Sequence, residues 1–120
     1  MYVDGFLLVI PTRHIRTYKR MSSAAGKVWM KSGALEYREN VGDDLAIKKV
    51  IPFTKAAKAK RGESVVFSWI VYRSRAHRDR VNAKVMKDPV MIKMMTAKSP
   101  FDMKKMSYGG FKMLVDSKRR

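Results

Sequence analysis

The chain has 120 residues, no cysteine and a formal net charge of +17, because 27 lysines and arginines face only 10 aspartates and glutamates. Its length and its 46% hydrophobic content predict a single globular domain over residues 1–120, and they exclude a disordered chain. The missing cysteines exclude a disulfide framework, a thiolate metal site and a cysteine nucleophile.

The N-terminal residues, MYVDGFLLVIP, are apolar but have no basic leader region, and the apolar run stops at Pro11. They predict a first strand over Tyr2–Ile10 rather than a signal peptide. No apolar run approaches the roughly 20 residues that span a bilayer. We therefore expect a soluble cytoplasmic protein that makes no membrane contact.

Thr12–Lys31 carries apolar residues at helical spacing on one side and basic residues on the other, which predicts an amphipathic surface helix. Thr12 or His14 is expected to cap the start of this helix, and Gly33 is expected to end it. Ala34–Val41 follows as a second strand and runs into a turn-forming Gly-Asp-Asp sequence.

Leu45–Gly62 is assigned no element, although its IKKVIPF stretch is compatible with a short edge strand interrupted by Pro52. Ser64–Tyr72 is the clearest strand, because Ser68 is the only polar residue inside its apolar run. A strand with one face in water alternates between polar and apolar residues. We therefore expect Ser64–Tyr72 to be buried on both faces.

Ser74 is expected to cap a second helix that runs to Lys87 and ends at Asp88–Pro89. A further short helix is predicted over Val90–Ala97. It is followed by a turn at Ser99–Asp102 and by a last strand over Met106–Asp116.

This order of elements is typical of an α+β fold, the ferredoxin-like βαββαβ protomer with an antiparallel sheet and two helices on one face. The helices cover one face only, whereas Ser64–Tyr72 should be buried on both. A second copy of the chain is the simplest cover for the other face. We therefore expect a homodimer.

Three segments resemble the YbaA-like bacterial family of unknown function: GALEYRENVGDD (Gly33–Asp44), VVFSWIVYRSRAHRDRVNAKVMKDP (Val65–Pro89) and PFDMKKMSYGGF (Pro100–Phe111). The resemblance runs through nearly the whole chain. It implies the dimeric α/β-barrel fold, in which two ferredoxin-like protomers join their sheets into a barrel with the helices outside. It implies no activity, because none is established for the family.

More distantly, the strand–Tyr72–x–Ser74–helix–Asp88 pattern is similar to that of cofactor-free monooxygenases of the same superfamily. Haem-degrading relatives share this pattern and place a histidine ligand on the short helix after the aspartate. Val90–Met95 occupies that place here and contains no histidine. We therefore expect no cofactor.

The second helix carries two polar residues on the side that should face the sheet. On a helical wheel, Val81, Val85 and Met86 define that side, and Arg78 and Asn82 lie between Val81 and Met86. Burying a guanidinium without a partner costs several kcal/mol. Arg78 must therefore find an acceptor.

Two explanations of Arg78 remain open. In the structural one, the guanidinium pairs with Asp4, Glu36 or Glu39, or with strand carbonyls, and holds the helix to the sheet. In the functional one, it lines a pocket for an anionic or carbonyl-bearing small molecule, which aromatic residues enclose. The candidate ligand-binding residues are Arg78, Asn82, Arg75, His77, Trp29, Trp69, Tyr108 and Glu36.

Three functions are compatible with these features. The chain could bind a small molecule between the sheet and the helices, or catalyse a cofactor-free monooxygenase-like reaction. Alternatively, it is a basic, non-enzymatic protein that associates non-specifically with nucleic acid or another polyanion. The residues do not choose between a binding protein and an enzyme. SYGGFKM lacks the RNA-recognition signature, so any nucleic-acid binding should be weak and non-specific. Two isolated histidines predict no metal site.

Overall fold

The computed structural model describes residues 1–99 and 102–119, and its centre is an antiparallel sheet of four strands. Their order across the sheet is β2-β3-β1-β4. The strands are β1 (Tyr2–Pro11), β2 (Glu36–Val41), β3 (Glu63–Tyr72) and β4 (Ser107–Lys112). Strands β1 and β3 form the centre of the sheet and pair along their whole length, from Tyr2 opposite Tyr72 to Pro11 opposite Glu63.

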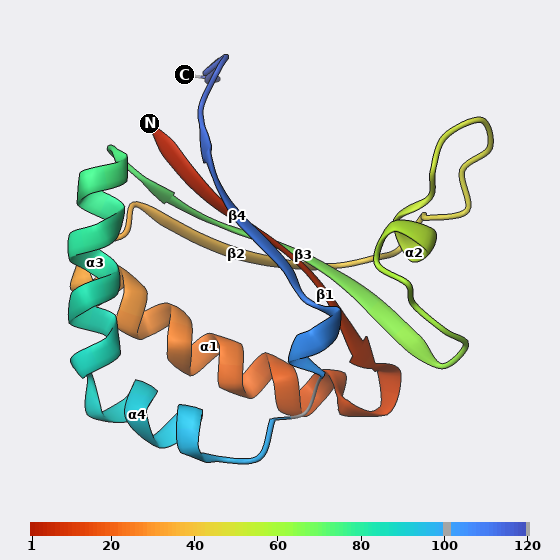
Figure 1. Cartoon of the computed structure of the whole chain (residues 1–120), viewed down its shortest axis with the longest axis horizontal. Helices are drawn as coiled ribbons and strands as arrows, with labels where there is room; N and C mark the ends of the chain where they lie inside the picture. Colours follow the sequence, from red (N-terminus) through yellow and green to blue (C-terminus); the bar gives the residue numbers. More distant parts are fainter. Residues whose placement is uncertain (100–101, 120) are drawn as a thin grey trace.

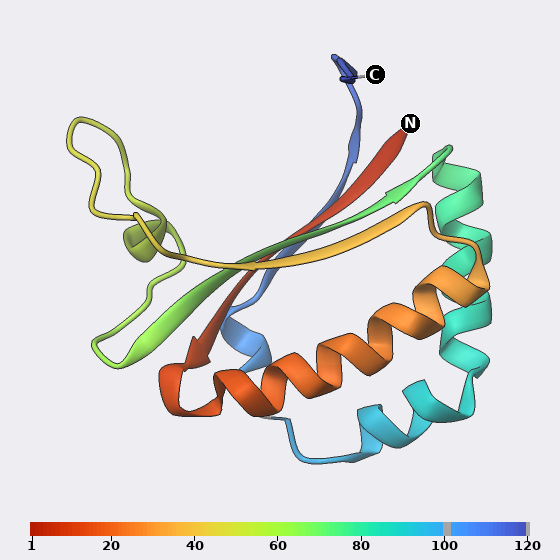
Figure 2. The ribbon, with the colours of Figure 1, turned by 180° about the vertical axis from the view of Figure 1, so that it is seen from behind.

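Three helices lie together on one side of the sheet, and a short fourth lies on the other (Figure 1). The view from behind gives the same arrangement, with α4 farthest from the sheet (Figure 2). The helices are α1 (Ile15–Ser32), α2 (Phe53–Ala56), α3 (Arg75–Lys87) and α4 (Pro89–Thr96), with short 3-10 turns η1 (Thr12–His14) and η2 (Met103–Lys105). The lone helix on the far side is α2.

The main core lies between the sheet and the helix layer. Tyr2, Ile70 and Tyr72 project from the two central strands and pack against Val28 of α1 and Val81 of α3, together with other buried apolar residues. Side chains alternate between the two faces of a strand, so every second residue of β1 and β3 points into this core. The core therefore holds α1 and α3 directly over the central strands.

The face away from this core is covered at one end only. There Ala57, next to α2, packs on Val9 and Val65. Farther along the same face, Phe67 is 44% exposed and Phe111 is 61% exposed. The expectation that β3 is buried on both faces is therefore met only in part by the single chain: Val65 and Val71 on this face are buried, whereas Phe67 is not.

Several predicted element ends are confirmed. The Ser74 side chain accepts a hydrogen bond from the His77 backbone N–H at 3.1 Å and caps α3. Gly33 ends α1 with a φ of 117°, a left-handed conformation that residues with a Cβ rarely adopt. Asp88 separates α3 from α4 and accepts a hydrogen bond from the Val90 N–H at 2.8 Å.

Other local predictions are wrong. Neither Thr12 nor His14 caps α1 with its side chain, because the chain first makes the η1 turn, and the Thr12 hydroxyl instead lies 2.8 Å from the Ser64 hydroxyl. The IKKVIPF stretch forms no strand. Pro52, which has a helix-compatible φ of −66°, instead precedes the short helix α2. The last strand ends at Lys112, and the turn predicted at Ser99–Asp102 lies partly outside the described residues.

The contact between Gly26 and Tyr37 yields a test of the packing between α1 and β2. A Cβ added at Gly26 would lie 2.8 Å from Cδ1 of the Tyr37 ring. We expect Gly26→Ala to lower the free energy of unfolding by about 1 kcal/mol, because overpacking costs about 1–3 kcal/mol and the gain in helix propensity is only about 1 kcal/mol. Denaturant unfolding measures the change. Thr17→Ala, on the exposed side of α1, is the control and should raise the free energy of unfolding slightly. An equal rise in both variants would contradict the contact between Gly26 and Tyr37.

Candidate functional site

Arg78 of α3 is bound to a carboxylate of the sheet. Its Nη1 donates to Oδ1 of Asp4 and to the hydroxyl of Tyr108, both at 2.8 Å, and its Nε donates to Oδ1 of Asp79 at 2.8 Å. The guanidinium also lies over the Tyr2 ring, 5.1 Å from the ring centroid. The predicted carboxylate partner of Arg78 is thus confirmed, and among the three candidates it is Asp4.

The Arg78–Asp4 ion pair is almost inaccessible to solvent. The side chains are 13% and 2% exposed, respectively. Burial raises the pKa of Asp4 above its ordinary value, although the neighbouring guanidinium lowers it. Burial and the Asp4 carboxylate likewise raise the pKa of Tyr108. Without Arg78, the Asp4 carboxylate would be a buried charge with no cationic partner.

Asn82, one turn beyond Arg78, joins α3 to α1 and to the end of β3. Its Oδ1 accepts hydrogen bonds from Trp29 Nε1 and from the Tyr72 hydroxyl, each at 3.3 Å. Trp29 Nε1 also donates to the Tyr72 hydroxyl at 3.1 Å. Asn82 thus satisfies two polar groups of the core, which is the role of a packing residue.

A second carboxylate, the half-buried Glu39 of β2, lies beneath α1 and accepts hydrogen bonds from four hydroxyl groups. Tyr18 and Ser68 donate to Oε1 at 2.6 and 2.5 Å. Tyr37 donates to Oε2 at 3.1 Å, and Ser22 also donates to that oxygen. We call Glu39, Tyr18, Ser22, Tyr37 and Ser68 the hydroxyl cluster.

The hydroxyl cluster concentrates acceptor oxygens at one place. A carboxylate offers about four acceptor positions, and each Glu39 oxygen receives two of the four donors. The hydroxyl protons are therefore directed at Glu39, and the Ser22 and Tyr37 hydroxyls also lie 3.0 Å from each other. Burial and the Glu39 charge both raise the pKa of Tyr18 and of Tyr37, so both phenols stay protonated at neutral pH.

The hydroxyl cluster borders a cavity between α1 and the sheet. An inner chamber of about 150 Å³ and an outer one of about 460 Å³ share Tyr18, Tyr37 and Glu39 in their walls. The apolar walls of the inner chamber include Phe6, Leu8, Trp29, Ile70 and Met106. A mostly apolar cavity with a few convergent polar groups is the usual form of a small-molecule site.

The remaining candidates on α3 do not reach this cavity. His77 Nδ1 accepts a hydrogen bond from the Arg73 N–H at 2.9 Å and so closes the start of the helix. Arg75 is exposed. Met86 is 46% exposed, so the prediction that it shares the buried side with Val81 and Val85 is wrong: those two valines alone fill the contact.

Trp69 and Glu36 lie on the opposite face of the sheet from Arg78. Trp69 Nε1 donates to Oε1 of Glu36 at 2.8 Å, and the Trp69 ring lies 5.7 Å from that of Phe67. Their grouping with Arg78 is wrong, because Trp69 neighbours Ile70, which points into the core, and successive strand residues face opposite sides. Of the eight predicted residues, four form two contacts on the helix side: Arg78 with Tyr108, and Asn82 with Trp29.

The sequence alone does not predict the hydroxyl cluster as a site, although Glu39 is among the expected partners of Arg78. The sequence nevertheless contains the pattern of residues that forms the cluster. Tyr37 and Glu39 alternate on a strand, and Tyr18 and Ser22 lie one turn apart on a helix. These signals become a site only when β2 lies under α1. Within the described residues, no buried side-chain nitrogen or oxygen lacks a hydrogen-bond partner, and no group of three metal-ligating side chains occurs.

The fold defines a class, the α+β proteins with a four-stranded antiparallel sheet, and two solved structures share it. An uncharacterized NIPSNAP domain protein from Burkholderia xenovorans superposes with a TM-score of 0.62 at 14% identity, over 99% of this chain and 100% of that one. Rv0793 from Mycobacterium tuberculosis does so with a TM-score of 0.56 at 15% identity, over 98% and 100%. At these identities the likeness concerns the fold alone. In the part of the chain that the structure describes, no helix has the length and apolarity to cross a membrane.

The chain belongs to the family described as "Protein of unknown function (DUF1428)", whose profile matches residues 1–103. It is 42% identical over 115 residues to "Uncharacterized protein YbaA" of Escherichia coli strain K12, covering 96% of this chain and 97% of that protein. The YbaA protein of Shigella flexneri matches to the same extent. The predicted YbaA-like family is thereby confirmed.

The Arg78–Asp4 pair yields a pH-dependent test. We expect Arg78→Met to lower the free energy of unfolding at pH 7 by about 3–5 kcal/mol, because it leaves the Asp4 carboxylate without its cation. Removal of Arg78 also raises the pKa of Asp4 further above its unfolded value. The folded state then holds the Asp4 proton more tightly, so the loss should shrink as the pH falls through this raised pKa. Urea unfolding between pH 4 and 7 measures it.

Two variants control this experiment. Asp4→Asn combined with Arg78→Met removes both charges, and the loss should become smaller and independent of pH. Arg80→Met, at an exposed position of the same helix, should change stability by no more than about 0.5 kcal/mol. If the loss of unfolding free energy in the single variant Arg78→Met does not depend on pH, the broken ion pair is not the cause of that loss.

Proposed function

We propose that this chain binds a small organic molecule in the cavity between α1 and the sheet. The observation that carries the proposal is the hydroxyl cluster, a half-buried carboxylate surrounded by four hydroxyls at the wall of a mostly apolar cavity. A packed core has no need for so many polar groups in one place, and each must be satisfied at a cost in folding. A binding site uses such groups to orient a ligand.

The chemistry of the cavity selects its ligand. Glu39 and the hydroxyl oxygens beside it are hydrogen-bond acceptors at the wall of the cavity, so they suit a ligand that carries a hydrogen-bond donor, such as a hydroxyl or an amine. A carboxylate on the ligand would be repelled by Glu39. The inner chamber of about 150 Å³ matches one aromatic ring, and Trp29 and Phe6 in its wall suit ring contacts.

The proposal gives Arg78 and Asn82 a structural role and gives Trp29 a role in the binding site. Arg78 donates hydrogen bonds to Asp4, Asp79 and Tyr108. Asn82 accepts hydrogen bonds from Trp29 and Tyr72. Trp29 also lies beside Tyr37, with ring centroids 5.9 Å apart, so it connects the hydroxyl cluster to α3.

We further propose that the chain is a homodimer of ferredoxin-like protomers whose sheets form an α/β barrel. The βαββαβ order and the strand order β2-β3-β1-β4 support the ferredoxin-like topology. The exposed rings of Phe67 and Phe111, together with Trp69 between them on the uncovered face, support a contact between sheets. Covering such a face with a second copy removes apolar surface from water.

Phenol is the probe for the ligand proposal, because it combines one ring with one hydroxyl donor. At about 0.6 kcal/mol for each of its seven non-hydrogen atoms, well below the ceiling for small ligands, phenol binds with a Kd on the order of 1 mM. We expect phenol to shift the NMR signals of Tyr18, Tyr37 and Ile70, and benzoate to leave them unchanged. Glu39→Gln, which releases the hydroxyls, should weaken phenol binding at least about tenfold.

Glu36→Gln is the matched control, because Glu36 lies on the other face of the sheet and bonds to Trp69. It should leave phenol binding unchanged. Equal binding to all three proteins would show that the hydroxyl cluster does not recognise the ligand, and no saturable binding to the parent chain would remove the proposed site. Thermal unfolding of each variant establishes that the fold is kept.

Sedimentation equilibrium at micromolar concentration tests the dimer. The parent chain should sediment at twice its 13.8 kDa mass, and Phe67→Glu should sediment as a folded monomer, because a charge on the uncovered face prevents its burial. Met30→Glu, which places the same charge on the helix side at a residue 47% exposed, should remain dimeric. A parent chain that is well folded and monomeric would contradict the proposed dimeric barrel.

A further inference from the structure

The outer side of α1 is a continuous basic surface. Five cations, Arg16, Lys19, Arg20, Lys27 and Lys31, are exposed along this helix, and α1 contains no acidic residue. They extend over about 22 Å at 1.5 Å per residue, roughly four turns. We call these five residues the α1 cations.

Most of the α1 cations have no internal counter-charge. Lys31 pairs with Asp88 at 2.8 Å. Within residues 1–99 and 102–119, the other four form no ion pair with a carboxylate. Their positive field is therefore uncompensated by the chain itself and attracts a negative partner.

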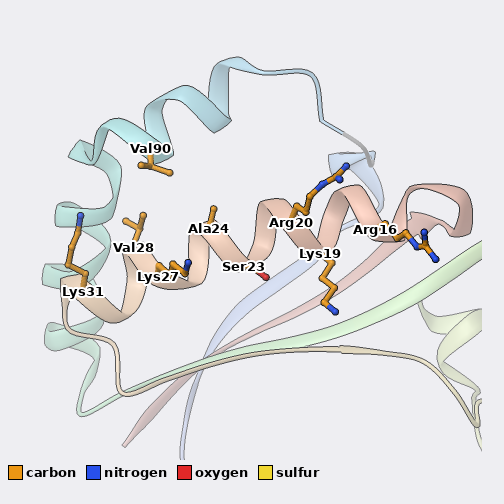
Figure 3. A pocket seen from close by; sticks show the side chains of 9 residues that line it. All are labelled: Arg16, Lys19, Arg20, Ser23, Ala24, Lys27, Val28, Lys31 and Val90. Carbon is orange, nitrogen blue, oxygen red and sulfur yellow. The ribbon is translucent and has the colours of Figure 1, made fainter.

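The α1 cations border a groove with an apolar floor. The groove lies between α1 and α4 and measures about 750 Å³. Figure 3 shows Ala24 and Val28 pointing from α1 towards α4, with Val90 of α4 pointing back at them. Arg20 and Lys31 rise from α1 on either side of this apolar floor. The surface is thus a hollow of small apolar side chains with cations around it.

We propose that the α1–α4 groove docks an acidic amphipathic helix of another protein. The apolar side chains of such a helix, spaced three and four residues apart, would enter the hollow over Ala24, Val28 and Val90. Its flanking aspartates and glutamates would meet the α1 cations, which also recur every three, four or seven residues along a helix. This inference is independent of the cavity under α1.

Charge excludes a second copy of this chain as the partner. Among the four helices that the structure describes, Asp79 is the only acidic residue, so no helix of a second copy could present an acidic face. The net charge of +17 makes the approach of two such surfaces repulsive.

The lining of the groove also disfavours nucleic acid and a lipid surface. No aromatic side chain lines the groove, so bases of a single strand would find no stacking platform, and a phosphate backbone would leave the apolar floor unused. A flat bilayer binds protruding apolar side chains, whereas Ala24 and Val28 lie at the bottom of a hollow, with Val28 only 4% exposed.

The test uses a fluorescein-labelled peptide of about 18 residues, with leucines at helical spacing flanked by glutamates, and a scrambled peptide of the same composition. Fluorescence anisotropy should show saturable binding of the first peptide and at least about tenfold weaker binding of the second. Arg20→Glu combined with Lys27→Glu should weaken binding at least about tenfold. Lys48→Glu combined with Lys55→Glu makes the same change in net charge elsewhere, and it should have an effect of about twofold or less.

Methyl NMR supplies a readout of position. On binding, the methyl signals of Ala24, Val28 and Val90 should shift, whereas those of Val9 and Val65 on the far face should not. Equal binding of the scrambled peptide, or equal loss in both double variants, would overturn the proposal in favour of diffuse charge attraction. Tighter binding of duplex DNA or of phosphatidylserine vesicles, abolished by the α1 double variant, would overturn it in favour of those partners.

Discussion

Buried carboxylates that need partners organise the interior of this protein. Asp4 and Glu39 lie between the sheet and the helices, where an unpaired charge costs several kcal/mol. Asp4 obtains a guanidinium from α3, and Glu39 obtains hydroxyls from α1 and from two strands. These bonds join the helices to the sheet, because each carboxylate lies on a strand and takes at least one partner from a helix.

The two clusters differ in what they leave available for chemistry. Around Asp4, a cation and an anion neutralise each other, and the group acts as a clamp between α3 and β1. Around Glu39, neutral hydroxyls surround a negative charge at the wall of a cavity. The Asp4 cluster therefore belongs to stability, and the hydroxyl cluster belongs to the proposed binding site.

The acidic residues also bear on the charge of the protein surface. Acidic side chains are few, and several are engaged with neighbours: Asp4, Glu36, Glu39, Glu63 and Asp88 all accept hydrogen bonds from the chain's own groups. Little negative charge remains to balance the exposed cations of α1. The surface of α1 is therefore basic, and this charge underlies the proposed selectivity of the α1–α4 groove for acidic partners.

The sequence by itself determined the elements with strong local signals. The strand around Trp69, the helix after Ser74 and the stop at Gly33 follow from periodicity, capping and backbone sterics, which act between near neighbours. It also required an acceptor for Arg78, because burying a guanidinium without a partner costs several kcal/mol. Only the tertiary structure decided that this partner is Asp4, that Trp69 and Glu36 lie on the uncovered face, and that Glu39 gathers its hydroxyls. These outcomes depend on which face of the sheet the helices cover and on which strands become neighbours, and periodicity within one segment carries no information about either.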